Sequence, residues 1–262
     1  MIPITSRRHP FVARCRALAA GRDADLVLLD GPHLVGEALA SGVPIIAAAI
    51  APRMADDPLC AKLAELASGG AEIYQASAEV MEAASPARSP SGMVAIARVG
   101  EAPLTVALAG NLVVAAVGVQ DPGNIGAIIR VADAAGATGF AATAGCADPL
   151  GWKALRGSMG SAFRVPLISG VSADAMVSAA RSAGLKIIAT CPAGGTAHDA
   201  LDLTQPALFL LGSEGPGLPA DLIAAADLRV RIPMREPVES LNVAVAAGIL
   251  LFETRRQRQA AG

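Results

Sequence analysis

Short apolar runs and amphipathic stretches alternate along the chain. Among the first hundred residues, helix-type patterns at 10–20, 33–40, 59–67 and 78–84 are interleaved with strand-like runs at 26–29, 45–49, 72–75 and 93–98. Strands interleaved with helices predict a small α/β/α sandwich. Residues 99–110 contain Gly100, Pro103 and Gly110 and are expected to form a linker.

The alternation becomes clearer beyond residue 110. Residues 112–119 form a continuous apolar run, which is typical of a central strand buried on both faces. We expect further strands at 138–142, 163–166, 186–190, 208–211 and 228–232, and helices at 125–135, 149–156, 173–183, 219–226 and 241–257. Ser240 is placed to cap the last helix. The prediction is an α/β protein with a smaller domain at 1–98 and a second, mainly parallel domain at 111–262.

Composition narrows the class of protein. Of 262 residues, 53% are hydrophobic but only 3% are aromatic, so there is core enough for two domains packed mostly with small side chains. No apolar run is long enough to span a membrane and no secretory signal is visible, so we expect a cytoplasmic protein. Four scattered cysteines without a CxxC pair, and three unclustered histidines, predict free thiols and no metal site.

Positive charge is concentrated at the start of the chain, although the net charge is −2. The first 22 residues contain five arginines and no acid: Arg7, Arg8, Arg14, Arg16 and Arg22. Local charge rather than net charge supplies affinity for a phosphate backbone. A solvated helix face explains the same pattern, and both interpretations remain open.

Three polar loops follow apolar strands in the second region. They are residues 121–126 with Arg130 beyond them, residues 211–217 with Glu214, and residues 232–242 with Ser240 and Asn242. Ligands of open α/β sheets bind at strand ends, so we expect these loops, including Asn124 in the first, to form one site. Ordinary turns are the alternative explanation for each loop taken alone. Neither a Rossmann fingerprint nor a Walker A loop is present.

In this order, the three loops resemble motifs 1, 2 and 3 of the SpoU/TrmH family of RNA 2′-O-ribose methyltransferases. The resemblance covers roughly residues 111–257, and residues 156–166 are similar to another segment of that family. Residues 30–35 with Glu37 look like the L30e-like substrate-binding domain that many members carry. The resemblance implies a trefoil-knotted fold, S-adenosylmethionine as cofactor and a homodimer.

The resemblance also implies roles for individual residues. The functional polar residues of the family fall on Asn124, Arg130, Glu214, Ser240 and Asn242, whereas Val131 departs from the hydroxyl residue that often follows the motif 1 arginine. The cofactor would be held by Thr190, Leu211, Gly212, Ile232 and Leu241, and the RNA by Arg7, Arg8, Arg14 and Arg16. Our hypothesis is that Arg130 binds an RNA phosphate and stabilises the developing alkoxide, and that Glu214 orients Arg130 or a loop of a partner chain.

Several functions remain open at this point. The L30e-like region favours ribosomal RNA over transfer RNA as the substrate. A catalytically silent RNA-binding protein on the same fold is a further alternative. A nucleotide-binding α/β protein without methyl transfer would have no need of Arg130 or Asn242.

Overall fold

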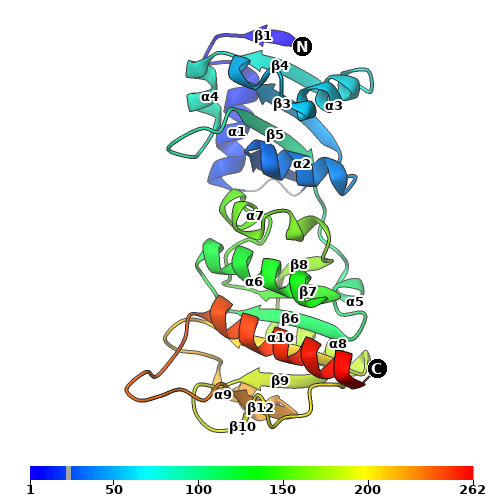
Figure 1. Ribbon diagram of the computed structural model, residues 1–262, viewed down its shortest axis with the longest axis vertical. Coiled ribbons are helices and arrows are strands. Elements are labelled where there is room, and N and C mark those ends of the chain that lie inside the picture. Colours follow the sequence, from blue (N-terminus) through cyan, green and yellow to red (C-terminus); the bar gives the residue numbers. More distant parts are fainter. Residues whose placement is uncertain (22–24, 262) are drawn as a thin grey trace. The chain divides into compact units, whose positions relative to one another are not determined.

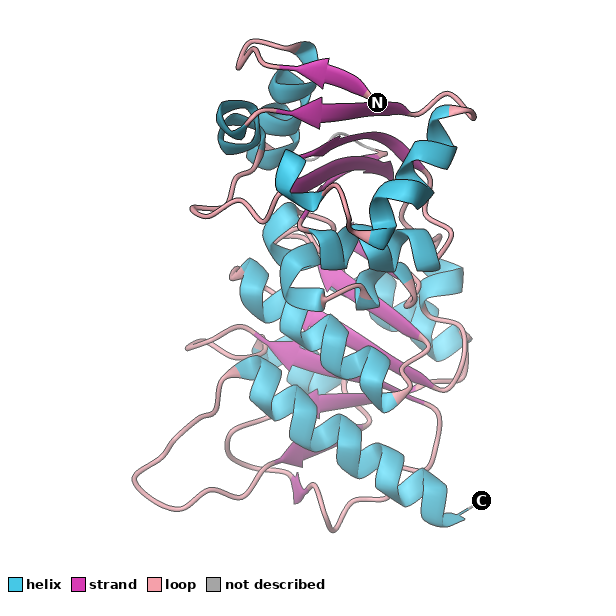
Figure 2. Cartoon of the chain, turned by 45° about the horizontal axis from the view of Figure 1, so that its top comes forward, coloured by secondary structure: helices cyan, strands magenta, loops and turns pink. Residues whose placement is uncertain are grey.

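The computed structural model describes residues 1–21 and 25–261, so Arg22 of the expected basic patch lies outside the described residues. The chain divides into two compact units, shown in Figures 1 and 2. The first unit comprises Met1–Gly100 with Leu150–Phe163, and the second comprises Glu101–Pro149 with Arg164–Gly262.

The first unit contains a five-stranded sheet between two layers of helices. Its strand order is β1-β4-β3-β5-β2, and β5 runs antiparallel to both β3 and β2. Helices α1 and α4 bury their apolar side chains against one face, and α2 and α3 lie against the other (Figure 1). The elements are β1 (Ile2–Ile4), α1 (Pro10–Ala20), β2 (Leu26–Asp30), α2 (Pro32–Ala40), β3 (Ile45–Ile50), η1 (Pro52–Met54), α3 (Pro58–Ala67), β4 (Glu72–Ala76), α4 (Ala78–Ala84) and β5 (Met93–Arg98).

A segment from much later in the chain completes the first unit. Helix α7 (Trp152–Ser158) contacts β2, and Trp152 packs against the same core cluster as α1 and α4. It is followed by the short helix η2 (Ser161–Phe163). The pattern predicted the helix, but local spacing carries no information about which sheet it joins.

The second unit is built on a seven-stranded sheet in which every pairing is parallel. The strand order is β10-β12-β9-β11-β6-β7-β8. Its elements are α5 (Leu104–Ala107), β6 (Leu112–Val117), α6 (Pro122–Ala135), β7 (Gly139–Thr143), β8 (Leu167–Val171), α8 (Ala173–Ser182), β9 (Lys186–Thr190), β10 (Thr196–Ala197), β11 (Ala207–Gly212), α9 (Ala220–Ala225), β12 (Leu228–Arg231) and α10 (Val243–Ala261).

Both faces of this parallel sheet are covered, which explains why its central strands are apolar at every position. Alternate residues of β6, β9 and β11 pack with α8 and α9 in one core cluster. Helices α6 and α10 lie side by side over the opposite face (Figure 1). Because the strands are parallel, all their carboxyl ends meet along one edge of the sheet.

Two expectations about elements are wrong. The strand expected at 163–166 is instead the end of η2 followed by loop, and β8 begins only after Pro166, which lacks the N–H that a strand would donate. Ser240 does not cap the last helix, because that helix begins at Val243 and the Oδ1 of Asn242 accepts its first free N–H groups. The short strand β1 was not predicted.

The segment expected as a linker is ordered. It contains α5, and the N–H of Ala102 donates to the carbonyl of Leu167 at 2.8 Å, beside strand β8. Within the described residues, no helix is long and apolar enough to cross a membrane. All four cysteines are free thiols.

Candidate functional site

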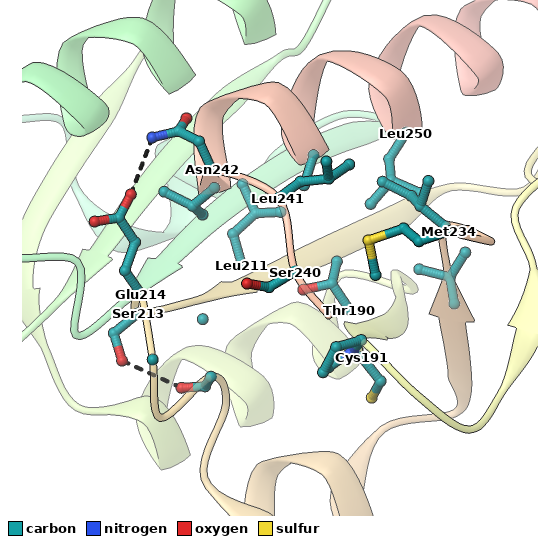
Figure 3. Close-up of a pocket in the computed structure, with 18 residues that line it drawn as sticks. Thr190, Cys191, Leu211, Ser213, Glu214, Met234, Ser240, Leu241, Asn242 and Leu250 are labelled. Carbon is teal, nitrogen blue, oxygen red and sulfur yellow. Dashed lines mark hydrogen bonds between the residues drawn. The ribbon is translucent and has the colours of Figure 1, made fainter. Parts of the chain in front are cut away.

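A pocket opens in the second unit at the carboxyl edge of the parallel sheet. Its volume is about 420 Å³, within the range of small-molecule sites. The ends of β9, β11 and β12 and the first turns of α10 supply its walls (Figure 3). The lining residues are Thr190, Cys191, Pro192, Leu211, Gly212, Ser213, Glu214, Gly215, Gly217, Val230, Ile232, Met234, Ser240, Leu241, Asn242, Val243, Ala246 and Leu250.

One side of the pocket is apolar and the other is polar. Leu211, Leu250, Leu241 and Met234 bring hydrocarbon and sulfur surface to the cavity (Figure 3). Thr190 has its hydroxyl turned to the carbonyl of Leu210, to which it donates at 2.9 Å, so its methyl group is left for the cavity. Such a lining suits a flat, weakly polar ring with charged groups at one end.

The polar side is a hydrogen-bonded network that joins all three loops. The Nδ2 of Asn124 donates to Oε1 of Glu214 at 2.8 Å. The Nδ2 of Asn242 donates to the same Oε1 at 2.9 Å and to Oδ1 of Asn124 at 2.9 Å. Asp121 holds the first loop by accepting the N–H of Asn124 at 2.9 Å, as the N-cap of α6. Residues up to 118 positions apart thereby meet at one carboxylate.

The helix cap fixes which way these amides face. Oδ1 of Asn242 accepts the N–H groups of Ala244 and Val245 at 3.0 and 3.3 Å, so its Nδ2 must point to Glu214. Oε1 of Glu214 accepts the hydrogen bonds of both amides, so the amide of Asn124 also presents its Nδ2. One N–H of Asn124 and Oε2 of Glu214 form no hydrogen bond with the described residues and are available to a ligand.

Gly212 is required by the turn that follows it. A Cβ at this position would lie 2.4 Å from the backbone of both Gly217 and Leu218. The turn closes through the N–H of Gly217, which donates to the carbonyl of Ser213 at 3.0 Å, and through the Ser213 hydroxyl, which donates to the carbonyl of Gly217 at 3.3 Å. The absence of a side chain at Gly212 thus lets the backbone of Gly217 and Leu218 pack against it. The turn closed in this way places Glu214 in the network.

Comparison with known proteins agrees with this geometry. Residues 111–252 match the SpoU rRNA Methylase family. The chain belongs to that family. It is 34% identical to an uncharacterized tRNA/rRNA methyltransferase of Synechocystis, over 98% of this chain and 95% of that protein. It is 32% identical to the 23S rRNA (guanosine-2′-O)-methyltransferase RlmP of Bacillus subtilis, over 87% of this chain and 88% of that protein.

A solved structure extends the likeness to the whole chain. The S-adenosylmethionine-bound rRNA methyltransferase of Sinorhizobium meliloti superposes with a TM-score of 0.86 and 32% identity, covering 97% of each chain. The expected family and the α/β fold with a parallel sheet are confirmed. The trefoil knot and the L30e-like character of the first unit stay predictions.

The residues present fit S-adenosylmethionine. All five residues expected to hold the cofactor, namely Thr190, Leu211, Gly212, Ile232 and Leu241, line the pocket. The apolar residues Leu211, Ile232 and Leu241 would hold the adenine ring, and the bound cofactor would supply an activated methyl group. Across the described ranges, no three His, Cys, Asp or Glu side chains are grouped to hold a metal ion.

The structure gathers four of the five expected polar residues. Glu214, Ser240 and Asn242 line the pocket, and Asn124 joins them through the network. Arg130 is exposed on α6 and makes no hydrogen bond or ion pair with any described residue. Glu214 contacts the two asparagines rather than Arg130, so the hypothesis that it orients that arginine within one chain does not match this geometry.

The N-terminal arginines differ in how their donors are used. Arg14 forms an ion pair with Glu72 at 3.2 Å, and Nε of Arg16 donates to the carbonyl of Ala83 at 3.0 Å. Arg7 and Arg8 are exposed. Arg7 and Arg8 therefore have more donors available for a phosphate than Arg14 and Arg16 have.

Several pocket residues were not predicted. Cys191 and Pro192 directly follow the end of β9, and burial raises the pKa of the Cys191 thiol. Ala246 and Leu250 follow Asn242 at intervals of four residues along α10. Residues so spaced share one helix face, and this signal was available in the sequence.

Proposed function

We propose that this protein transfers a methyl group from S-adenosylmethionine to a ribose 2′-hydroxyl of ribosomal RNA. The observation that carries the proposal is the Asn124–Glu214–Asn242 network, two residues of which, Glu214 and Asn242, line a pocket of cofactor size. It joins the three loops that resemble the motifs of the family, and one N–H of Asn124 and Oε2 of Glu214 form no hydrogen bond with any residue that the structure describes.

The chemistry requires orientation and charge stabilisation more than strong acid or base groups. S-adenosylmethionine supplies an activated methyl group on a sulfonium. A ribose hydroxyl is a poor nucleophile until it loses its proton, so the protein must align its oxygen and stabilise negative charge on it. Asn124, Ser240 and Asn242 position the ribose and the cofactor, and Glu214 keeps both amides in place.

Arg130 supplies the positive charge. Its guanidinium stays protonated in proteins and therefore binds an RNA phosphate and stabilises the alkoxide rather than removing the proton. The proton passes to a phosphate oxygen or to water. Arg130→Lys keeps the charge but lacks the bidentate fork, and we expect turnover to fall at least tenfold, whereas near-normal turnover would contradict this role.

Ribosomal RNA is favoured over transfer RNA because the likeness to named rRNA enzymes runs through both units. The Bacillus subtilis and Sinorhizobium meliloti proteins match 87% and 97% of this chain. The first unit thus accompanies the methyltransferase unit in rRNA-directed relatives. We propose that this unit contacts RNA, with Arg7, Arg8, Arg14 and Arg16 as predicted contributors, and that the protein acts in the cytoplasm.

A homodimer is also proposed. Val245 and Phe252 lie two turns apart on α10 and are 52% and 49% exposed, and Leu241 before the helix is 37% exposed. Large apolar side chains on one exposed helix face commonly mark an interface. A second copy is the occupant that the family resemblance implies. Light scattering would give twice the chain mass for the wild type and a smaller mass for Phe252→Glu.

The experiment that tests the substrate is tritium transfer from methyl-labelled S-adenosylmethionine to purified RNA from a strain lacking this gene. Ribosomal and transfer RNA are offered separately. Label in one ribosomal RNA supports the proposal. Label in transfer RNA alone would retain the chemistry and overturn the substrate, and cofactor binding with no label in either RNA would favour a silent RNA-binding protein.

A further inference from the structure

Helix α7 presents two cations on its exposed side. Lys153 and Arg156 are exposed and three residues apart, so they lie on the same helix face. The inner face of α7 is buried through Ala154, Leu155 and Ser158. Between residues 150 and 163 the sequence contains no acidic residue. The inserted segment therefore adds two positive charges to the surface of the first unit.

Arg156 lies beside a buried carboxylate and forms no hydrogen bond with the part of the chain that the structure describes. Its Nη1 lies 3.7 Å from Oδ2 of Asp30, whose side chain is only 3% exposed, while the Arg156 side chain is 57% exposed. This distance is beyond a hydrogen bond, and Arg156 forms none with the described residues. A guanidinium that is steered by a buried carboxylate, with its five N–H groups free, is well suited to receive a phosphate.

The same buried carboxylate joins a second basic segment. Oδ1 of Asp30 accepts the hydroxyl of Ser85 at 2.9 Å. Ser85 begins the loop 85–92, which contains Arg88, exposed, and no acid. Burial raises the pKa of Asp30, and the Ser85 hydrogen bond and the Arg156 charge act against that rise. Asp30 thus contacts two acid-free segments, 85–92 and 150–163, whose nearest ends are 58 positions apart in sequence.

Lys153 has a related arrangement. Its Nζ lies 5.6 Å from the centroid of the Trp152 ring, and Trp152 is packed against the core of the first unit. Lys153 is exposed and makes no hydrogen bond or ion pair with the described residues, so its ammonium group is available to a phosphate. Arg14 and Arg16, by contrast, already direct donors to Glu72 and to the carbonyl of Ala83.

We propose that Arg88, Lys153 and Arg156 form a phosphate-binding face of the first unit that contacts the RNA backbone. The choice of RNA as partner rests on the proposed function; the face itself rests on exposure, charge and unused donors. It assigns a role in substrate binding to the inserted segment 150–163, which lies outside the three site loops.

The test compares Lys153→Gln/Arg156→Gln with the control Lys62→Gln/Arg98→Gln. The control removes two exposed positive charges from elsewhere in the first unit, including the surface pair of Arg98 with Asp25 at 3.5 Å. Binding of an unmodified 23S rRNA transcript is measured from 50 to 300 mM salt, together with calorimetric binding of S-adenosylmethionine. KM and kcat for that transcript provide a second readout.

Loss of two phosphate contacts should make the negative slope of log K for RNA association against log salt concentration shallower by about 1.4. It should weaken RNA binding about tenfold near 0.15 M salt. We expect KM for RNA to rise by a similar factor, with kcat and cofactor affinity unchanged and the control close to wild type. Arg88→Gln, in an exposed loop, should lower the slope by about 0.7 and serves if the double variant does not fold.

Two results would overturn the inference: an unchanged slope in the α7 variant, or an equal loss in the control, which would show that only total charge matters. The proposed function fails separately, if the wild type transfers no methyl group to RNA. A wild type without methyl transfer whose RNA binding still falls in the α7 variant would retain the phosphate-binding face.

Discussion

Asn242 has two separable tasks, and replacing it in two ways distinguishes them. Its Oδ1 caps α10 by accepting two N–H groups, and its Nδ2 donates to Glu214 and Asn124. Asn242→Ala removes both functions. Asn242→Ser keeps an N-cap oxygen but loses the amide donors, because serine has no nitrogen and is one atom shorter.

The two tasks of Asn242 predict losses of different kinds, one in stability and one in rate. Loss of an N-cap costs about 1 kcal/mol, which for a protein of this length lowers the melting temperature by about 3 °C. Loss of the amide donors frees Asn124 and Glu214 to move, and a misplacement of about 1 Å at a reacting centre costs about 100-fold in rate, or about 2.7 kcal/mol. Asn242→Ala should show both losses, and Asn242→Ser only the second.

Thermal unfolding by circular dichroism and single-turnover methyl transfer to RNA measure the two effects. A serine variant with near-normal turnover would refute the positioning role of the network. An alanine variant that melts with the wild type would refute the assignment of Asn242 as the cap. An unchanged circular dichroism spectrum at 25 °C is the control that both variants are folded.

Two further predictions concern the turn and the acid stability. Gly212→Ala places a Cβ 2.4 Å from the backbone of Gly217 and Leu218. We therefore expect the free energy of unfolding, measured with denaturant, to fall by about 1–3 kcal/mol, and cofactor binding, measured by calorimetry, to be much weaker. Unchanged values would show that the turn adapts to the added methyl group. Hydrogen bonds from Arg256 and Gln257 lower the pKa of Glu253 to about 2, so its stabilising effect is complete above the unfolded pKa near 4.3 and is lost as the pH falls toward 2. The melting temperature of Glu253→Gln should therefore depend less on pH in that window, and parallel curves for the two proteins would contradict the assignment.

Local patterns predicted the elements well because the central strands of a parallel sheet are continuous apolar runs between amphipathic helices. Residues 112–119 and 208–211 were identified in this way, and they became β6 and β11, which pair with each other. The strand order was not predictable, since pairing partners up to about a hundred residues apart leave no local trace. The strand β8 was misplaced because Pro166 shifts its start and Gly170 interrupts its apolar pattern.

The site was predictable to the level of loops, and the contacts within it were not. Polar residues at the ends of successive strands indicated that Asn124, Glu214 and Asn242 belong together, because parallel strands end at one edge. Which residue Glu214 would bind depends on side-chain directions, and it accepts from Asn124 and Asn242 rather than from the expected partner Arg130. Helix α7 joins the first unit through its contacts with β2 and the packing of Trp152 on the core, and such long-range contacts could not be read from sequence spacing.

The position of the transferred methyl group tests the account most directly. RNA labelled with tritium by this protein is hydrolysed completely in alkali, which cleaves every linkage except one whose ribose 2′-oxygen is methylated. We predict that the label is recovered in a single alkali-resistant dinucleotide from ribosomal RNA. Label recovered in mononucleotides would place the methyl group on a base and contradict the proposed chemistry.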